Sequence, residues 1–575
     1  MGVLSYLLLG ITHPTELRAM IGYKLWRDPL NDIKANPDAS GWNRERMRDC
    51  WGLLDLTSRS FAAVIKELKG ELSRVICLFY LVLRALDTVE DDMTIPAERK
   101  IPLLVDFYKY LEQPGWNFKD SGPDEKDRQL LVEFDKVIAE FQLLDQGYKT
   151  VISDITAKMG AGMASYIELS AKQPLSVSTW KHFDLYCHFV AGLVGEGLSR
   201  LFSESKVERP WLGHQLELSN HMGLFLQKTN IIRDYAEDCE EGRYFWPKEC
   251  WGDDHAKFGS QPEVASGIIE TAPGSNKFKP ADNELGQRSM YVLSSMLLDA
   301  MSHATHALDY LALLKEQSVF NFCAIPQVMA IATLELMFNN PDVFKKNVKI
   351  RKGVAVQLIL KAVNPRDVAY TFLTYSRKIH KRLSPADPNF IRWSVELARI
   401  EQWCETYYPS FIAAAAEGKE ADVRAAAIRS WSEGRRTRAI ILSHAKAEGR
   451  DPDAADGQSA LAAAQRSALD PRDLMTEEER KAAEKRDRDE MMKFFFIMLL
   501  GMAAFMGIVA VITFEIVWWF SMDGQPDPLR SNVVKLYYVV KQHGWETVRD
   551  IERTVRLSVQ HVWKHGLGSS AKLEL

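Results

Sequence analysis

The chain has 575 residues, which is enough for one large domain with appendages or for several domains. Its hydrophobic content of 46% and charged content of 26% are ordinary for a globular protein, and a net charge of -5 argues against broad nucleic-acid binding. Seven scattered cysteines argue against a zinc site or a disulfide framework and favour a reducing compartment.

The region from about residue 41 to 410 has the pattern of helices. Apolar residues recur there at spacings of three and four, as in Val75, Leu78, Phe79, Val82 and Leu86. Strand patterns are scarce, so we predict one all-α domain over residues 1–410 with a central cavity between its helices. Near the N-terminus, the apolar run Val3–Ile11 lacks a basic flank and is too short to cross a bilayer, so no targeting signal is expected.

Three stretches have the composition of loops or linkers. Residues 114–126 contain a Pro-Gly and a Gly-Pro pair, and residues 252–285 are rich in Gly, Pro, Ser, Asp and Asn without an apolar period. We interpret the second as an insertion between two core helices. Residues 411–490 are rich in Ala, Glu, Arg and Asp, which predicts a charged, partly helical linker.

Residues 494–514 contain no charged side chain. At about 1.5 Å per residue they would extend roughly 30 Å, the thickness of a bilayer's hydrocarbon core. Two tryptophans and a phenylalanine follow, as in an interfacial aromatic belt, so we predict a transmembrane helix over 494–520. More Lys and Arg precede this helix than follow it, which predicts a cytosolic N-terminal domain and a 521–575 tail across the membrane.

An acidic motif, Asp87–Asp92, closes an apolar helical run. Asp87 and Asp91 are four residues apart and share a helix face, where like charges destabilise a helix by a few tenths of a kcal/mol. Helix stability therefore gives no reason for the pattern. Magnesium does, because it takes carboxylate oxygens and bridges them to phosphate.

A second acidic motif repeats this spacing with Asp234 and Asp238. Gln227 and Asn230 precede it and extend a polar stripe along an otherwise apolar helix. Two such stripes facing each other would hold a dinuclear or trinuclear magnesium cluster around a diphosphate.

Three arginines are candidates for binding the diphosphate. Arg84 lies one turn before the first motif, Arg233 directly precedes the second, and Arg59 stands in a Ser-Arg-Ser-Phe sequence. A single arginine is most often a surface or ion-pair residue, but the position of two of them beside acidic motifs favours phosphate binding.

Four stretches together resemble the squalene synthases, a group of head-to-head prenyl synthases. They are residues 83–92 (LRALDTVEDD), 186–195 (YCHFVAGLVG), 227–238 (QKTNIIRDYAED) and 320–327 (FNFCAIPQ). The resemblance covers roughly residues 10–410 and the existence of a C-terminal anchor. It does not extend to the linker, the 252–285 insertion or the tail.

The resemblance implies roles for individual residues. Magnesium ligands are expected at Asp87, Glu90, Asp91, Asp234 and Asp238. Catalytic roles are expected for Tyr186, Phe322, Arg84, Asp87 and Asp234, with Tyr186 deprotonating or steering a carbocation. Substrate contacts are expected from Ser58, Arg59, Ser60, Phe61, Tyr80, Arg84, Gln227, Asn230, Arg233, Cys323, Pro326 and Gln327. An aromatic face such as that of Phe322 also stabilises a passing cation without quenching it.

No dinucleotide-binding fingerprint is present in the sequence. The Gly-rich segment Gly160–Ser165 follows no strand pattern and lacks the last glycine, so we interpret it as close helix packing. The basic segment Lys349–Gly353 resembles the family's contact with NADPH phosphates, which makes Lys349 and Arg351 the expected cofactor-binding residues.

The resemblance implies that the chain joins two farnesyl diphosphates head-to-head into presqualene diphosphate and reduces this with NADPH to squalene. It also implies a monomer anchored in the endoplasmic reticulum membrane. One alternative is a phytoene or dehydrosqualene synthase, which needs no hydride. Another is a catalytically idle membrane adaptor with the same helical fold.

Overall fold

The computed structural model describes residues 12–25, 27, 29–172, 177–252, 256–269, 284–408 and 492. Within these ranges the chain is helical and contains no strand, which confirms the predicted all-α class. The first half contains α2 (Pro14–Leu25), α3 (Pro37–Ser40), α4 (Glu45–Thr57), α5 (Arg59–Lys66), α6 (Leu72–Asp91), α7 (Ala97–Tyr110), α8 (Arg128–Val132), α9 (Phe134–Phe141), α10 (Gln146–Lys172), α11 (Trp180–Cys187), the π-helix η1 (His188–Gly192) and α12 (Leu193–Glu204).

The second half continues with long helices and several short helical segments. They are η2 (Pro210–His214), α13 (Leu216–Arg233), α14 (Tyr235–Glu240), α15 (Lys248–Trp251), η3 (Pro262–Ala265), α16 (Ser266–Ile269), α17 (Glu284–Met301), α18 (Ala304–Leu313), α19 (Gln317–Met337), η5 (Pro341–Phe344), α20 (Lys352–Lys361), α21 (Pro365–Arg382) and α22 (Phe390–Tyr407).

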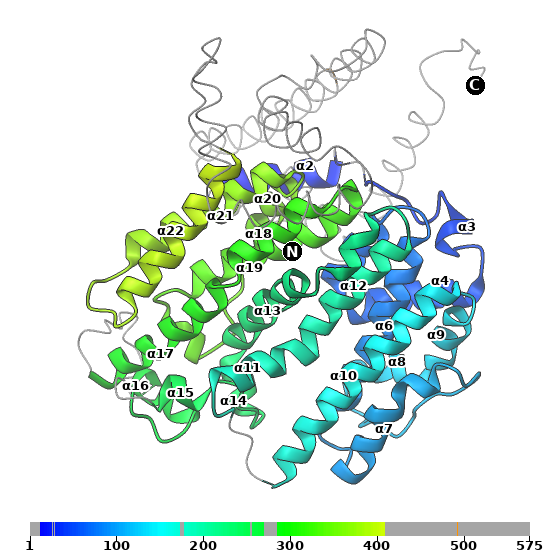
Figure 1. Ribbon diagram of the computed structural model, residues 1–575, viewed down its shortest axis with the longest axis horizontal. Coiled ribbons are helices and arrows are strands. Elements are labelled where there is room, and N and C mark those ends of the chain that lie inside the picture. Colours follow the sequence, from blue (N-terminus) through cyan, green and yellow to red (C-terminus); the bar gives the residue numbers. More distant parts are fainter. Residues whose placement is uncertain are drawn as a thin grey trace, which may run out of the picture. The chain divides into compact units, whose positions relative to one another are not determined.

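The core is built around α6, α10, α12, α13 and α19, which lie in neighbouring rows (Figure 1). Fifteen of the twenty residues of α6 are buried, because its sequence is apolar on every side except one narrow stripe. Each fully buried Leu, Val or Phe stabilises the fold by roughly 1.5–3 kcal/mol. The helix that carries the first acidic motif is therefore held rigidly.

Close helix packing accounts for the glycines of α10. A Cβ on Gly160 would lie 2.2 Å from the carbonyl oxygen of Leu104 in α7, and one on Gly162 would lie 2.4 Å from the ring of Phe189 in η1. Neither position has room for a side chain. This packing agrees with our interpretation of the segment and leaves no nucleotide-binding loop there.

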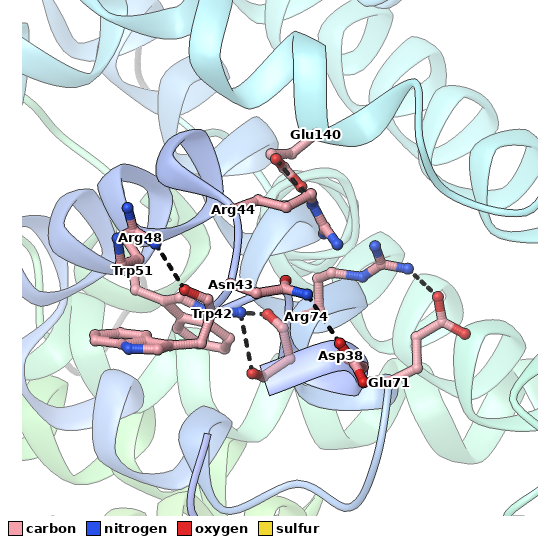
Figure 2. A network of polar contacts seen from close by, with 10 residues as sticks. Asp38, Trp42, Asn43, Arg44, Arg48, Trp51, Glu71, Arg74 and Glu140 are labelled. Carbon is pink, nitrogen blue, oxygen red and sulfur yellow. Dashed lines mark hydrogen bonds and ion pairs between the residues drawn. The ribbon is translucent and has the colours of Figure 1, made fainter. Parts of the chain in front are cut away.

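A network of polar contacts fastens α3 and α4 to the core (Figure 2). Arg44 binds the buried carboxylate of Glu140 in α9 at 2.7 Å. Arg48 donates to the carbonyl of Trp42 at 3.0 Å, and the indole of Trp51 donates to the carbonyl of Ser40 at 3.2 Å. The Arg44–Glu140 pair spans 96 residues of the chain and ties α4 to α9, and both of these helices pack against α6.

The structure departs from the sequence-based elements in two places. Helix α2 precedes residue 41, where the helical pattern was expected to begin. Within the predicted 252–285 loop, the described residues 256–269 form η3 and α16, which are anchored by the fully buried Val264 and Ile268. The sequence does not predict these short helices, because two buried apolar residues among polar ones do not form a helical repeat. The other predicted loop, 114–126, is irregular as expected.

The predicted linker, transmembrane helix and tail lie outside the described residues, apart from Met492. Among the described residues one helix, α19, is long and apolar enough to cross a membrane. However, 78% of its most apolar stretch is buried inside the domain, so we assign it to the core.

Candidate active site

A polar stripe runs along one face of α6. Every residue of this helix is described, and the five that are not buried are Tyr80, Arg84, Asp87, Glu90 and Asp91. Their spacings of four, three, three and one place them on a single face. From Tyr80 onward the helix therefore presents its charged side chains in one direction and its apolar side chains to the core.

The second acidic motif sits at the junction of α13 and α14. Asp234 separates the two helices, and its backbone N–H donates to the carbonyl of Asn230 at 2.9 Å. Gln227, Asn230 and Asp234 are all half-buried and repeat at spacings of three and four, so they form the expected polar stripe. The guanidinium of Arg233 binds the Asp234 carboxylate through two nitrogens, at 2.8 and 2.5 Å.

Arg243 joins the two acidic motifs. One of its nitrogens lies 3.5 Å from Asp91 of α6, and another lies 2.7 Å from Asp238 of α14 and 2.8 Å from Glu241. Gly242, with a φ of 74°, makes the tight turn before it, and the Arg243 N–H donates to the Asp238 carbonyl at 2.7 Å. Residues nearly 150 positions apart in the sequence thus surround one cation.

Arg84 has a buried partner that the sequence did not indicate. Its guanidinium binds Asp127 through two nitrogens, at 2.7 and 2.5 Å, and lies 3.9 Å from Asp87. Asp127 is 1% exposed and comes from the end of the 114–126 loop. Arg84 is therefore fixed in the α6 stripe by an ion pair, and it faces the first acidic motif.

Three carboxylates of the two motifs are desolvated and lie near other acidic groups. Desolvation by the surrounding protein raises the pKa of Asp87 to about 7, and the nearby Arg84 only partly offsets this. Desolvation, with the charges of Asp91 and Asp87, raises the pKa of Glu90 to about 8. Desolvation also raises the pKa of Asp238 to about 6, against the opposing effect of Arg243. Negative charge is therefore in excess here, and a further cation would stabilise it.

The donor set suits magnesium held together with a diphosphate. Within the described residues, no group of three or more His, Cys, Asp or Glu side chains is already gathered around one metal position. Magnesium is usually held by one or two carboxylates, water and substrate phosphates rather than by a complete protein cage. Two carboxylate stripes on either side of Arg243, with uncompensated charge, fit that arrangement.

Tyr186 lies beside the first acidic motif, at the end of α11. Its ring stacks on Phe245 with 5.0 Å between centroids and meets the edge of Tyr166 at 5.2 Å. The pKa of Tyr186 is raised well above its usual range by burial, and next by the charges of Glu90 and Asp91. Its hydroxyl makes no hydrogen bond within the described part of the chain, so the group is available to a ligand.

The local fold explains how Tyr186 is held. Thr179 caps the start of α11 by accepting a hydrogen bond from the His182 N–H at 3.2 Å. The π-helix η1 follows directly, and such bulges are frequent at functional sites. Buried Lys228 of α13 then pairs with Asp184 of α11 and Asp299 of α17, at 2.5 and 2.6 Å.

The expected residues of α19 are core residues on a buried helix. Phe322 and Cys323 are 6% and 7% exposed, and the Phe322 ring meets the edge of Phe202 at 6.1 Å. Gln327 donates to the carbonyl of Met222 in α13 at 3.2 Å, while its own oxygen is buried without a hydrogen-bond partner in the described residues. Pro326 lies within the helix and is half-buried.

Four of the remaining predicted residues, Ser58 to Phe61, lie at the start of α5. Ser58 caps α5 by accepting a hydrogen bond from the Phe61 N–H at 3.2 Å, and the Phe61 ring lies 6.4 Å from that of Tyr80. The side chains of Arg59 and Ser60 are not among those described. The Phe61 contact brings the start of α5 to the α6 stripe.

The basic segment before α20 lies next to the second acidic motif. Asn347 donates to Glu237 of α14, two residues before the exposed Lys349. Arg351 instead binds the buried Glu16 of α2, with 3.0 Å between Nε and Oε1. The structure therefore leaves Lys349 open and holds Arg351 in an ion pair.

Comparisons with known proteins agree with this site. The family model for squalene/phytoene synthase matches residues 54–354, a range that contains both acidic motifs, Tyr186 and the basic segment. The chain belongs to the squalene/phytoene synthase family. Relatives in this family include the squalene synthase of Mycosarcoma maydis, 83% identical over the whole of both chains, and that of Ganoderma lucidum, 52% identical over 72% of this chain and 87% of the relative.

The fold agrees with the same family. A solved structure of TcSQS in complex with a ligand matches with a TM-score of 0.56 and 38% identity, covering 63% of this chain and 99% of that one. The predicted family resemblance and the predicted enzyme class are confirmed. The squalene synthase names favour the reductive member of the family over a phytoene-type synthase and over an idle adaptor.

Proposed function

We propose that the site between α6, α11, α13 and α14 condenses two farnesyl diphosphates to presqualene diphosphate and then reduces this intermediate to squalene with NADPH. The observation that carries the proposal is Arg243, which draws the two acidic motifs to one place through Asp91 and Asp238. Tyr186 lies beside them and feels their charge. Together with the family, this arrangement supports ionisation of an allylic diphosphate.

The carboxylates Asp87, Glu90, Asp91, Asp234 and Asp238 would hold magnesium. Bound there, the metal supplies a Lewis acid that stabilises negative charge on the departing diphosphate. Arg84 and Arg233 stand at the two stripes, each fixed by a carboxylate, so their remaining N–H groups can donate to diphosphate oxygens.

Tyr186 acts as a neutral phenol in this proposal. Burial and the neighbouring carboxylates raise its pKa, so it does not present a phenolate that a carbocation would alkylate. Its ring and its oxygen lone pair can still stabilise positive charge at close range. The aromatic rings of Tyr166 and Phe245 shield it and keep water from the reacting carbons.

The reductive step needs a nucleotide site near the same motifs. The contact between Asn347 and Glu237 brings the 347–351 segment to α14. Lys349 is exposed and makes no ion pair with the described residues, so it is the better placed of the two expected phosphate contacts. Phe322 and Cys323, from α19, are proposed to line the pocket of this second step.

The sequence beyond residue 408 completes the proposal. We infer that the uncharged segment 494–514 spans the endoplasmic reticulum membrane, with the linker 411–490 and the monomeric catalytic domain on the cytosolic side. Squalene is a pure hydrocarbon, and an anchored enzyme releases it where it dissolves.

A product assay tests the proposed function. The full chain in detergent is supplied with farnesyl diphosphate and Mg²⁺, with or without NADPH, and the products are extracted. We expect squalene with NADPH and presqualene diphosphate without it. The same C30 hydrocarbon under both conditions would establish a dehydrosqualene-type enzyme, and no product from folded protein would refute the catalytic assignment.

A further inference from the structure

Helices α2 and α20 form one continuous surface. They pack side by side (Figure 1), and the bond between Arg351 and Glu16 ties the start of α20 to α2. A Cβ on Gly353 would lie 2.4 Å from the Glu16 Cβ, so the two backbones approach as closely as a glycine allows. We call this surface, made by Pro14–Leu25 and Lys352–Val363, the α2–α20 face.

Large apolar side chains on this face point into solvent. Ile21 and Leu25 of α2 are 42% and 58% exposed, and Leu360 and Val363 at the end of α20 are 37% and 43% exposed. The spacing of four places Ile21 and Leu25 on one side of α2, while Leu360 lies in the last turn of α20 and Val363 two residues beyond its end. Exposed apolar side chains gathered on two adjoining helices indicate an interaction surface.

The charges around these side chains are positive. Arg18, Lys24, Lys352 and Lys361 are exposed, and their side chains make no ion pair or hydrogen bond with any described residue. The two helices contain one acidic residue, Glu16, which is buried and bound to Arg351. An apolar strip bordered by unpaired cations is complementary to a bilayer that contains anionic lipids.

A groove next to the apolar strip has the chemistry of a headgroup site. It lies between α20 and α21, has a volume of about 430 Å³, and is lined by Lys361, Lys378, Tyr370 and Tyr375 among others. One carboxylate, that of Asp367, also lines it, and this group is bound by Asn364 at 2.8 Å and lies 3.5 Å from Arg366. The Lys378 ammonium lies 4.5 Å above the Tyr375 ring. Two cations and two aromatic rings suit a phosphate ester at the level of the membrane interface.

We propose that the α2–α20 face docks the catalytic domain on the surface of an anionic lipid bilayer. Ile21, Leu25, Leu360 and Val363 enter the interface, and the four cations contact lipid phosphates. This contact is separate from any membrane span further along the chain. It would hold the domain in one orientation, whereas a linker alone would leave it free to rotate.

Depth-dependent fluorescence quenching tests the docking. A polarity-sensitive fluorophore is attached to Ile21→Cys in the full chain, which is reconstituted into vesicles of phosphatidylcholine with or without phosphatidylserine, part of it brominated. The matched control is Ile391→Cys, an equally aliphatic position that is 75% exposed in the first turn of α22. The same treatment of the native chain gives the background from its own cysteines.

We expect brominated lipid to quench the label at position 21, more strongly with phosphatidylserine, and to leave the label at position 391 unquenched. Charge reversal at Arg18, Lys24 and Lys361 should weaken docking about fivefold for each charge removed. Squalene formation in detergent should be unchanged, which shows that the variant is folded. If the variant does not fold, high salt applied to the native sequence must remove the phosphatidylserine-dependent quenching instead.

Three results would overturn the proposal. Equal quenching at positions 21 and 391 would show that the domain has no preferred face. Insensitivity to both phosphatidylserine and salt would remove the electrostatic part. Protection of the position-21 label from aqueous iodide without lipid quenching would show that protein covers the face, either the apolar run Val3–Ile11 or a second copy of the chain.

Discussion

Replacing Arg243 with Gln should destabilise the protein and make its stability depend on Mg²⁺. Arg243 is the cation between Asp91, Asp238 and Glu241, so its loss leaves three carboxylates facing one another. A divalent cation bound among them would restore the missing positive charge. The prediction therefore tests whether the two acidic motifs form a single cation site.

The magnitude follows from the exposure of each pair. Asp91 and Glu241 are 44% and 50% exposed, so their pairs with Arg243 contribute at most about 0.5 kcal/mol each. Asp238 is 8% exposed, and removing the partner of a largely buried charge costs about 2 kcal/mol once the partial exposure of Arg243 is allowed for. The total loss is about 2–3 kcal/mol. Because the unfolding entropy of a domain of this size is on the order of 0.8 kcal/mol/K, the thermal midpoint should fall by about 2–4 °C.

The assay is thermal unfolding of the full chain in detergent, with and without Mg²⁺. Arg243→Gln should regain most of its lost stability when Mg²⁺ is added, and the native chain should gain less. The matched control is Arg377→Gln, which breaks an exposed pair with Glu401 and should cost under about 0.5 kcal/mol with no added response to Mg²⁺. An Arg243→Gln chain with native stability and a native response to Mg²⁺ would refute the shared site.

Other substitutions test the individual roles. Asp87→Asn should lower turnover about 100- to 1000-fold. It should not lower the thermal midpoint, because burial already disfavours the charged form of the Asp87 carboxyl group. Unchanged turnover would show that Asp87 is not a metal ligand. Tyr186→Phe should stop presqualene diphosphate formation in a folded protein, and normal formation would leave Tyr186 a packing residue. Lys349→Ala combined with Arg351→Ala should preserve formation of the first product and raise the KM for NADPH. Glu16→Gln, which only frees Arg351, should leave the KM for NADPH unchanged. An unchanged KM in the double variant would place the nucleotide elsewhere.

The stripes of the site could be predicted because they are local features. Asp87 and Asp91 share a face of α6 for the same reason that any residues four apart do, and the apolar run before them fixes which face is buried. The stripe from Gln227 to Asp234 follows the same rule. Helical periodicity therefore gave the fold class and the polar faces of the two motif helices without knowledge of how the helices pack.

The counter-ions could not be predicted in this way, because they come from turns and loops. Asp127 ends an irregular segment, and nothing in its sequence indicates a bond to Arg84, 43 residues earlier. Arg243 reaches Asp91 only because Gly242 turns the chain back after α14. The one available signal was its position, an arginine after the first glycine beyond an acidic motif.

The structure also gives contacts within the protein to two residues that the sequence indicated as ligand contacts. Ser58 caps α5, a local role that its position before an amphipathic helix would have allowed. Arg351 is expected to contact NADPH phosphates, and packing also pairs it with Glu16, 335 residues away. A charge run in the sequence shows which cations are present, but only packing shows which of them remain unpaired.

The arginines of this site are each paired with a carboxylate, so their positive charge is already neutralised. Arg84, Arg233 and Arg243 are each neutralised by a carboxylate within 2.7 Å, so the described side chains offer two incoming diphosphates no net positive charge. Substrate anions would be repelled by the remaining carboxylates. We therefore expect attraction to come from a divalent cation held by those carboxylates, so that Mg²⁺ would serve substrate binding as well as ionisation. The arginines then provide direction, because a guanidinium fixed on one side by an aspartate can donate to phosphate only from the other.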